Sequence, residues 1–341
     1  MFGLEKHYRH RANLRSVCRA VLQNACTVRN RLNSVKKGCV PFHKVIVWKV
    51  GRMKAVRQHY KNINVKGRKR MKVYTCFPEG KAKALTMSYD DGKFQDERLI
   101  QIFDKNGIKG TFNINYGLME REQDPPRIAR ARVRELYKNH EVATHCMTHP
   151  TIARCPLVEV AQEILDDRKG LEELTGKLVR GHAYPNGSYS EEIKQLFRQL
   201  GIAYGRVVET VANYELPVDP LEWHPTCHHN DPELMKKAEF FANFKKKQYL
   251  KLMYVWGHSY EFDSRDNWNV IEEFCEYMGG RDDIWYATNI EIIDYMEAAK
   301  RLKFSGNNEM VYNPSAASVW LNVDDGKYVE VKGGATVNLN D

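Results

Sequence analysis

The sequence predicts an α/β fold built around a parallel sheet, most simply a barrel. Segments with the pattern of strands alternate with segments with the pattern of helices from about residue 83 to residue 300. This alternation is typical of βα units, because parallel strands need a crossover connection. Hydrophobic residues make up 43% of the 341-residue chain, which is enough to build a core around such a sheet. Beyond this region, short β runs separated by Asn-Pro, Asp-Gly and Gly-Gly predict a small β appendage over residues 303–341.

Local patterns predict the individual elements. Strands are predicted from short apolar runs that end in turn residues, and they cover residues 83–89, 110–114, 141–144, 178–183, 202–207, 250–256 and 284–287. Helices are predicted from apolar residues at helical spacing, and they cover residues 96–105, 128–138, 156–174, 190–200, 268–278 and 290–302. The clearest β runs of the appendage are residues 318–323 and 328–331.

The net charge of +10 is unevenly divided along the chain. Residues 1–70 contain 19 lysines and arginines and one acid, Glu5, whereas residues 71–341 have a net charge of −8. Such a basic segment can bind nucleic acid or an acidic lipid surface by releasing counterions, and it is also similar to an Arg-rich transit peptide. No base-reading motif accompanies it. We therefore expect a disordered extension upstream of a translation start at Met71, and a core (residues 71–302) that binds no nucleic acid.

The sequence shows neither a membrane-spanning segment nor a secretory signal. No apolar run approaches the roughly 20 residues of a membrane-spanning helix, and no basic-then-apolar start ends in small residues. The eight cysteines are scattered, so we expect mostly reduced thiols. These observations predict a cytoplasmic protein and exclude the fibrous, wholly disordered and disulfide-scaffold classes.

Three groups of polar residues lie where predicted strands end, which is where reactive side chains lie in α/β barrels. Two histidines four residues apart meet on one face of a helical turn and can hold one cation, which a carboxylate from another loop would complete as a zinc site. Zinc in such a site activates water and polarises a carbonyl. Each signal alone also fits a common turn or a chance histidine pair, but together they favour a metal site. The three groups are Asp90-Asp91-Gly92, the pair His145 and His149, and His258.

These motifs, in this order, resemble those of the polysaccharide deacetylase family, the chitooligosaccharide-deacetylase-like carbohydrate esterases. The resemblance spans roughly residues 82–300. The family motifs T-F-D-D-G, H-[ST]-x-x-H, P-Y-G, D-x-x-D-W and a hydrophobic strand ending in His are similar, respectively, to residues 86–92, 145–149, 185–187, 219–223 and 252–258.

The resemblance implies a distorted (β/α)7 barrel and metal-dependent removal of N- or O-linked acetyl groups from an oligo- or polysaccharide. Carried over, Asp91, His145 and His149 would bind a divalent ion, with Zn²⁺ expected. Asp90 would be the general base toward the attacking water, and His258 the general acid toward the leaving group. The remaining expected residues are Asn186, whose backbone N–H would help hold the oxyanion, and the substrate-binding residues Tyr184, Pro185, Trp223 and Trp256, although core packing is an equal alternative for Trp256.

Several positions depart from the family pattern. Ala183 stands where many relatives carry an arginine that braces the catalytic aspartate, and Arg180 can substitute only if the loop geometry permits. Cys146 replaces a hydroxyl residue, and Thr148 is near enough to take over its hydrogen bond; Cys146 as a metal ligand is the minor alternative. The fourth motif is loose, so Asp219 is either its carboxylate or a simple turn residue.

The remaining polar residues leave alternatives open. His228 and His229 are expected to be solvated loop histidines, and Glu261 would either tune the acidity of His258 or cap the next segment. The competing function is a catalytically weak carbohydrate-binding protein that retains the barrel, although Asp90 and His258 favour an enzyme. The substrate stays open among chitin oligomers, peptidoglycan fragments, acetyl-xylan and other acetylated sugars, with a soluble oligosaccharide favoured.

Overall fold

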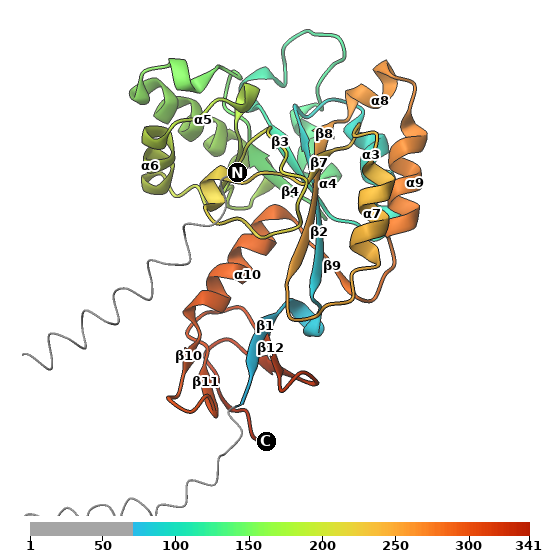
Figure 1. The fold of residues 1–341 in the computed structure, drawn as a ribbon. Helices are drawn as coiled ribbons and strands as arrows, with labels where there is room; N and C mark the ends of the chain where they lie inside the picture. The colour runs from blue at the N-terminus through green and yellow to red at the C-terminus, as the bar shows by residue number, and fades with distance from the viewer. Residues whose placement is uncertain (1–70) are drawn as a thin grey trace, which may run out of the picture. The chain divides into compact units, whose positions relative to one another are not determined.

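A curled parallel sheet forms the centre of the structure (Figure 1). The computed structural model describes residues 71–341, so the predictions for residues 1–70 lie outside the described residues. Seven strands follow the order β6-β5-β4-β3-β2-β8-β7, and β9 also pairs with β2. Their bounds are β2 Lys83–Asp90, β3 Gly110–Ile114, β4 Glu141–Thr144, β5 Gly181–Ala183, β6 Tyr204–Arg206, β7 Cys227–His228, β8 Lys251–His258 and β9 Ile284–Tyr286.

Strand β2 is the centre of this sheet, because it pairs in parallel with β3, β8 and β9. All eight of its residues are buried, as expected for a parallel strand covered on both faces. Leu85 and Met87 lie in one hydrophobic cluster, whereas Ala84 lies in a second cluster with Trp223. Since side chains alternate along a strand, Asp90 at the end of β2 faces the same side as Ala84.

Trp223 joins the two edges of the curled sheet. It forms a parallel bridge with Arg206 of β6, and its N–H donates to Gly205 O at 2.9 Å. Residues 224–226 then lead from this bridge into β7. The sheet therefore closes into a distorted barrel, which confirms the fold predicted from the sequence.

The helices alternate with these strands, and their ends follow from local sequence. Helix α5 ends at Gly176 with φ of 70°, a left-handed conformation that favours glycine. Helix α10 begins with a capping box between Thr288 and Glu291. Their bounds are α3 Asp96–Lys105, α4 Arg130–Leu136, α5 Leu157–Thr175, α6 Glu191–Gln199, α7 Leu234–Ala242, α8 Tyr260–Ser264, α9 Trp268–Met278 and α10 Asn289–Arg301.

The residues after α10 form two small antiparallel sheets. One has the order β1-β12-β13 and the other β10-β11-β14. Strand β1 precedes the barrel in sequence, so residues at both ends of the described chain share one sheet, a pairing absent from the sequence prediction. The hydroxyl of Tyr295 in α10 connects this sheet to the barrel, because it donates to Cys76 O and accepts from Trp320 N. The strands are β1 Val73–Cys76, β10 Lys303–Phe304, β11 Met310–Tyr312, β12 Val319–Val323, β13 Lys327–Val331 and β14 Thr336–Asn338.

Among the described residues, no helix has both the length and the apolar character needed to cross a membrane.

Replacing Trp223 with alanine should destabilise the barrel. The side chain is 1% exposed, and its ring contacts those of Tyr204 and Tyr254 at centroid distances of 5.6 and 4.9 Å. Its loss should lower the free energy of unfolding by about 3–5 kcal/mol, measured by denaturant titration. The control is Val218→Ala in the same connection, because Val218 is fully exposed. Equal stability of the two variants would contradict this role for Trp223.

Candidate active site

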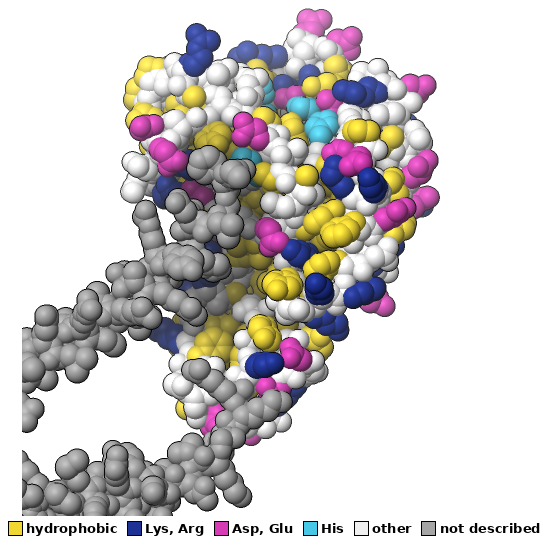
Figure 2. All heavy atoms as spheres, viewed as in Figure 1, with side chains coloured by type: hydrophobic (Ala, Val, Ile, Leu, Met, Phe, Trp, Pro, Cys, Tyr) yellow, Lys and Arg dark blue, Asp and Glu magenta, His cyan; other side chains and the backbone are white. Residues whose placement is uncertain are grey.

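The strand register brings the predicted polar residues to one end of the barrel. Asp90 is the partner of Asn113 in β3 and of His258 in β8, and His145 follows the last residue of β4. The carboxyl ends of parallel strands share one edge of a sheet, so these side chains converge. Figure 2 shows histidine side chains at the surface at this end of the molecule, beside acidic side chains.

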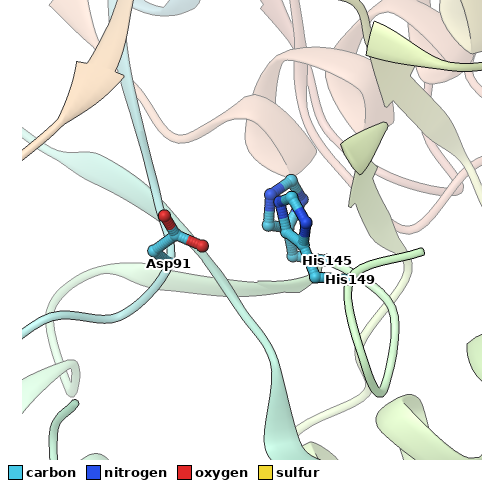
Figure 3. A group of neighbouring side chains, drawn as sticks. All are labelled: Asp91, His145 and His149. Atoms are coloured by element: carbon cyan, nitrogen blue, oxygen red, sulfur yellow. The ribbon is translucent and has the colours of Figure 1, made fainter. Parts of the chain in front are cut away.

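Asp91, His145 and His149 form a cluster with the composition of a metal site. One ligand atom from each residue lies within 4.8 Å of the other two. Figure 3 shows the Asp91 carboxylate on one side and the two imidazoles together on the other. Two imidazole nitrogens and one carboxylate oxygen are a donor set that suits Zn²⁺ and leaves coordination positions open. The residues therefore fit the metal that the sequence predicts.

His145 is prepared for such a role by its hydrogen bond. Its Nδ1 lies 2.8 Å from Ala183 O, and a carbonyl oxygen can only accept. The ring proton is therefore on Nδ1, which leaves the Nε2 lone pair available for a metal. Burial lowers the pKa of His145 to about 4, so the ring is neutral at neutral pH.

The loop from His145 to His149 differs from the helical turn predicted for it. Cys146 and His149 have positive φ angles of 63° and 61°. The loop is held by Asn115, whose side chain donates to the carbonyls of His145 and Cys146, and by Thr148, whose hydroxyl donates to Glu163 at 2.7 Å. The partner of the Thr148 hydroxyl is therefore in α5, and not in the loop to which its hydrogen bond was expected.

Cys146 does not belong to the metal-ligand cluster among the described residues. Its side chain is buried, and burial raises the pKa of its thiol well above the ordinary value. A thiol that keeps its proton is a poor metal ligand.

Asp90 is braced by an arginine that the sequence prediction missed. The guanidinium of Arg206 contacts the Asp90 carboxylate, and both side chains are buried. Arg180 does not take this role, because it binds Asp294 at 2.5 Å. Arg206 is the register partner of Ala183 on the neighbouring strand. One sequence signal could have identified Arg206. It is a charged residue at the end of an apolar strand, in the run Ile202-Ala-Tyr-Gly-Arg-Val.

This pair sets the charge of Asp90. Burial by itself favours the neutral acid, but the positive charge of Arg206 outweighs it and holds the pKa of Asp90 well below the usual range. Asn113 also donates to Asp90 Oδ1 at 2.8 Å. Asp90 is therefore an ionised carboxylate in a fixed orientation.

His258 lies beside Asp90 at the edge of the barrel. Its Nε2 is 3.9 Å from Asp90 Oδ2 and its Nδ1 is 3.6 Å from Glu261 Oε1. Burial disfavours the charged ring, but Glu261, Asp90 and Asp91 together outweigh burial and raise the pKa of His258 above its ordinary value. A cleft of 400 Å³ opens beside these residues, lined in part by Asp91, His149 and Tyr260.

The residues predicted to bind substrate are placed in the core instead. Tyr184 is fully buried and its hydroxyl donates to Leu221 O, Pro185 is also buried, and Trp223 is the closing residue of the barrel. Trp256 is 8% exposed and packs against the Arg206 guanidinium. These side chains fill the space between strands and helices, as the core-packing alternative for Trp256 expected, and a substrate-binding role for the four residues stays a prediction.

Two further predicted residues have different outcomes. Asn186 lies in the turn Pro185–Gly187 with φ of 57°, and its side chain donates to the hydroxyl of Thr151. The oxyanion role of its N–H stays a prediction. Asp219 accepts from Leu221 N and binds Lys194 and Arg198 of α6, so it is the turn carboxylate of the two alternatives.

Comparison with known proteins is consistent with this arrangement. Residues 78–205 match the family described as polysaccharide deacetylase. The matched segment contains Asp90, Asp91, His145 and His149, whereas Arg206 and His258 lie beyond it.

Two relatives show the extent of the likeness. The chain is 25% identical to a chitooligosaccharide deacetylase of Bradyrhizobium sp. (strain ANU 289) over 144 residues, 41% of this chain and 59% of that protein. The chain thus spans less than two thirds of that relative. The fold resembles that of a Mycobacterium smegmatis protein assigned to the polysaccharide deacetylases, with a TM-score of 0.52 and 18% identity over 66% of this chain and 93% of the other.

We expect removal of one ligand side chain to abolish tight metal binding. His149→Ala should lower Zn²⁺ affinity by more than the roughly 10–100-fold that outer partners of a metal site contribute. The measurement is calorimetric titration of the metal-free protein, with bound metal counted by elemental analysis. His224→Ala is the control, because His224 is a partly exposed histidine outside this cluster. Equal Zn²⁺ affinity in both variants would show that Asp91, His145 and His149 are not a metal site.

Proposed function

We propose that this protein is a metal-dependent hydrolase that removes N- or O-linked acetyl groups from an oligo- or polysaccharide. The observation that carries the proposal is the position of Asp90 and His258. They lie at neighbouring strand ends, next to the cluster of Asp91, His145 and His149. A protein that only bound sugars would have no need of a paired base and acid at this point.

The two adjacent aspartates have different tasks in this proposal. Asp90 is ionised and held by Arg206 and Asn113, so it can accept a proton from the attacking water. A divalent ion held by Asp91, His145 and His149, with zinc the expected ion, would polarise the acetyl carbonyl and favour ionisation of the water.

His258 and Asn186 act on the other parts of the acetyl group. A histidine with a raised pKa is protonated in part at neutral pH, so His258 can donate a proton to the leaving nitrogen or oxygen. The backbone N–H of Asn186 would donate to the oxygen that becomes negatively charged during attack.

Arg206 weakens the argument that this protein only binds carbohydrate. That alternative rested on the missing arginine at Ala183, and a guanidinium contacts Asp90 from the neighbouring strand instead. The deciding experiment is acetate release by the zinc-loaded protein from chitin oligomers, peptidoglycan fragments and acetyl-xylan oligomers. Sugar binding without acetate release from any of them would favour the binding protein.

Asp90→Asn and His258→Ala should each lower turnover by roughly 10²–10⁴-fold, the usual contribution of positioned acid–base catalysis. Asparagine keeps the shape of Asp90 but cannot accept the proton, and alanine removes the proton donor. Both variants should keep the Zn²⁺ content of the wild-type protein, because neither residue is in the ligand cluster. Acetate release at the wild-type rate from Asp90→Asn would contradict its role as the base.

Arg206→Gln should change the pH dependence of turnover. A general base works when ionised, so activity is lost as the pH falls through the pKa of Asp90. Arg206 holds this pKa well below the usual range. Without the guanidinium the pKa rises, and the acidic limb of the pH–rate profile should move to higher pH, whereas Arg206→Lys should keep part of the shift. An unchanged acidic limb in Arg206→Gln would show that the pair does not control Asp90.

A further inference from the structure

A second cluster of titratable side chains lies behind His258, and no proposed step involves its other two histidines, His228 and His229. The Oε2 atom of Glu261 in α8 lies 3.2 Å from His228 Nε2 and 3.0 Å from His229 Nε2. Its other oxygen, Oε1, faces His258 Nδ1 at 3.6 Å. One carboxylate is therefore surrounded by three imidazoles, a group that we call the histidine hub: Glu261, His228, His229 and His258.

His229 belongs to the core rather than to a solvated loop, so the sequence expectation is wrong for this residue. His228 lies in strand β7, and its side chain is 24% exposed. His229 is fully buried, and its ring stacks with the rings of Tyr89 and Phe262, with ring centroids 5.6 and 4.2 Å away. Its Nδ1 faces Gly257, where a Cβ atom would lie 2.1 Å from that nitrogen. Only a glycine at position 257 leaves room for this ring.

The positions of the ring protons distinguish between two interpretations of the hub, an anion surrounded by N–H groups and a second metal site. His228 Nδ1 accepts a hydrogen bond from Asn230 N at 3.1 Å, so the proton of the neutral ring is on Nε2, which faces Glu261. His229 Nδ1 faces a glycine whereas its Nε2 lies 3.0 Å from Glu261 Oε2, so a proton on Nε2, toward the carboxylate, is again favoured. A nitrogen that carries a proton cannot bind a metal. The four residues thus suit an anion surrounded by N–H groups better than a second metal site.

These contacts keep Glu261 charged and in one orientation. Burial raises its pKa, but the imidazoles outweigh burial and hold the pKa well below the usual range. The side chain of Asn230 also donates to Oε2 at 3.3 Å. With Oε2 facing His228, His229 and Asn230, Oε1 is the oxygen left to face His258.

We propose that Glu261 is the positioning residue of His258, and that His228 and His229 hold it in place for this task. A carboxylate beside Nδ1 keeps a proton on that nitrogen, so Nε2 faces Asp90 and the leaving group. Glu261 also stabilises the charged ring that must exist before the proton is donated. Asp219, the carboxylate of the loose fourth motif, is bound to Lys194 and Arg198. The proposal rests on the proposed function only for its effect on turnover.

The acidity of His258 depends on every charged group that faces it. These are Glu261 from α8, and Asp90 and Asp91 from the end of β2. The rings of His228, Trp256 and Tyr260 also surround it, with centroids 6.5, 5.8 and 5.3 Å away. Removing one negative neighbour should lower the pKa of His258 by about 1 unit or more.

The first test measures the pKa of His258 without turnover. Hydrogen–deuterium exchange at the imidazole C2 position, read by mass spectrometry on the zinc-loaded full chain, reports each histidine separately. Glu261→Gln should lower the pKa of His258, and Glu261→Asp should restore part of it. The matched control is Asp266→Asn, an exposed acid shortly after α8 that should leave the pKa unchanged. An unchanged pKa in Glu261→Gln overturns the proposal.

The second test uses acetate release by the same variants. A general acid works when protonated, so activity is lost as the pH rises through the pKa of His258. Glu261→Gln should therefore move the basic limb of the profile to lower pH and reduce kcat about 10-fold or more, with KM changed less than about twofold. A rise in KM with kcat unchanged would overturn the positioning role. If the pKa shift is present but neither the wild-type protein nor any variant releases acetate, the contact between Glu261 and His258 is supported and the proposed hydrolase activity is contradicted.

Metal counting excludes the other explanation of the hub. The wild-type protein should bind one equivalent of Zn²⁺, and Glu261→Gln and His229→Gln should bind the same amount. Two equivalents in the wild-type protein, with one lost in either variant, would show that the hub is a second metal site and would overturn the proposal.

Discussion

The buried ion pair between Asp90 and Arg206 is the interaction on which the site depends. Both side chains are removed from water, and an unpaired charge in such a place costs several kcal/mol. Asp90 ends β2 and Arg206 ends β6, with β3, β4 and β5 between them in the sheet. Their side chains meet only because the sheet curls and brings its edge across to its centre. The closure of the barrel and the orientation of Asp90 are therefore stabilised by the same pair.

The backbone after Asp90 explains how two consecutive aspartates serve different groups. Asp91 has φ of 78° and its N–H donates to Asn113 O, so the chain turns sharply where β2 ends. Asp90 keeps the orientation of the strand and faces the barrel interior. Asp91 lines the cleft with His149 and lies near His145. Each carboxylate also has its own arginine, since Arg127 contacts Asp91 and Arg206 contacts Asp90. Two acids that are neighbours in sequence are therefore contacted by two separate cations.

Local sequence predicted the first half of the barrel well and its long-range contacts poorly. The helix at Asp96–Lys105 and the strands at Gly110–Ile114 and Glu141–Thr144 have the predicted bounds, because apolar periodicity and turn residues determine them locally. The hydroxyl of Tyr295, which connects β1 and β12, and the stacking of His229 depend on residues far apart in the chain. Aromatic side chains were the hardest to place: Trp223 and Tyr184 were expected to bind substrate, and both pack inside the barrel.

Two of the three departures from the family pattern, at Ala183 and in the fourth motif, have a common physical explanation. A site requires a charge at a point in space, and more than one strand or helix can supply it. Ala183 and Arg206 are register partners on adjacent strands, which lie only about 4.8 Å apart, so an arginine on β6 can serve the aspartate that an arginine on β5 would serve. In the same way, Glu261 is near His258 because one short helix follows β8 directly, whereas Asp219 is committed to α6. Residues outside a sequence motif can therefore supply a charge that the motif lacks. For this chain, the charged residues around Asp90 and His258 indicate the chemistry better than the motif letters do.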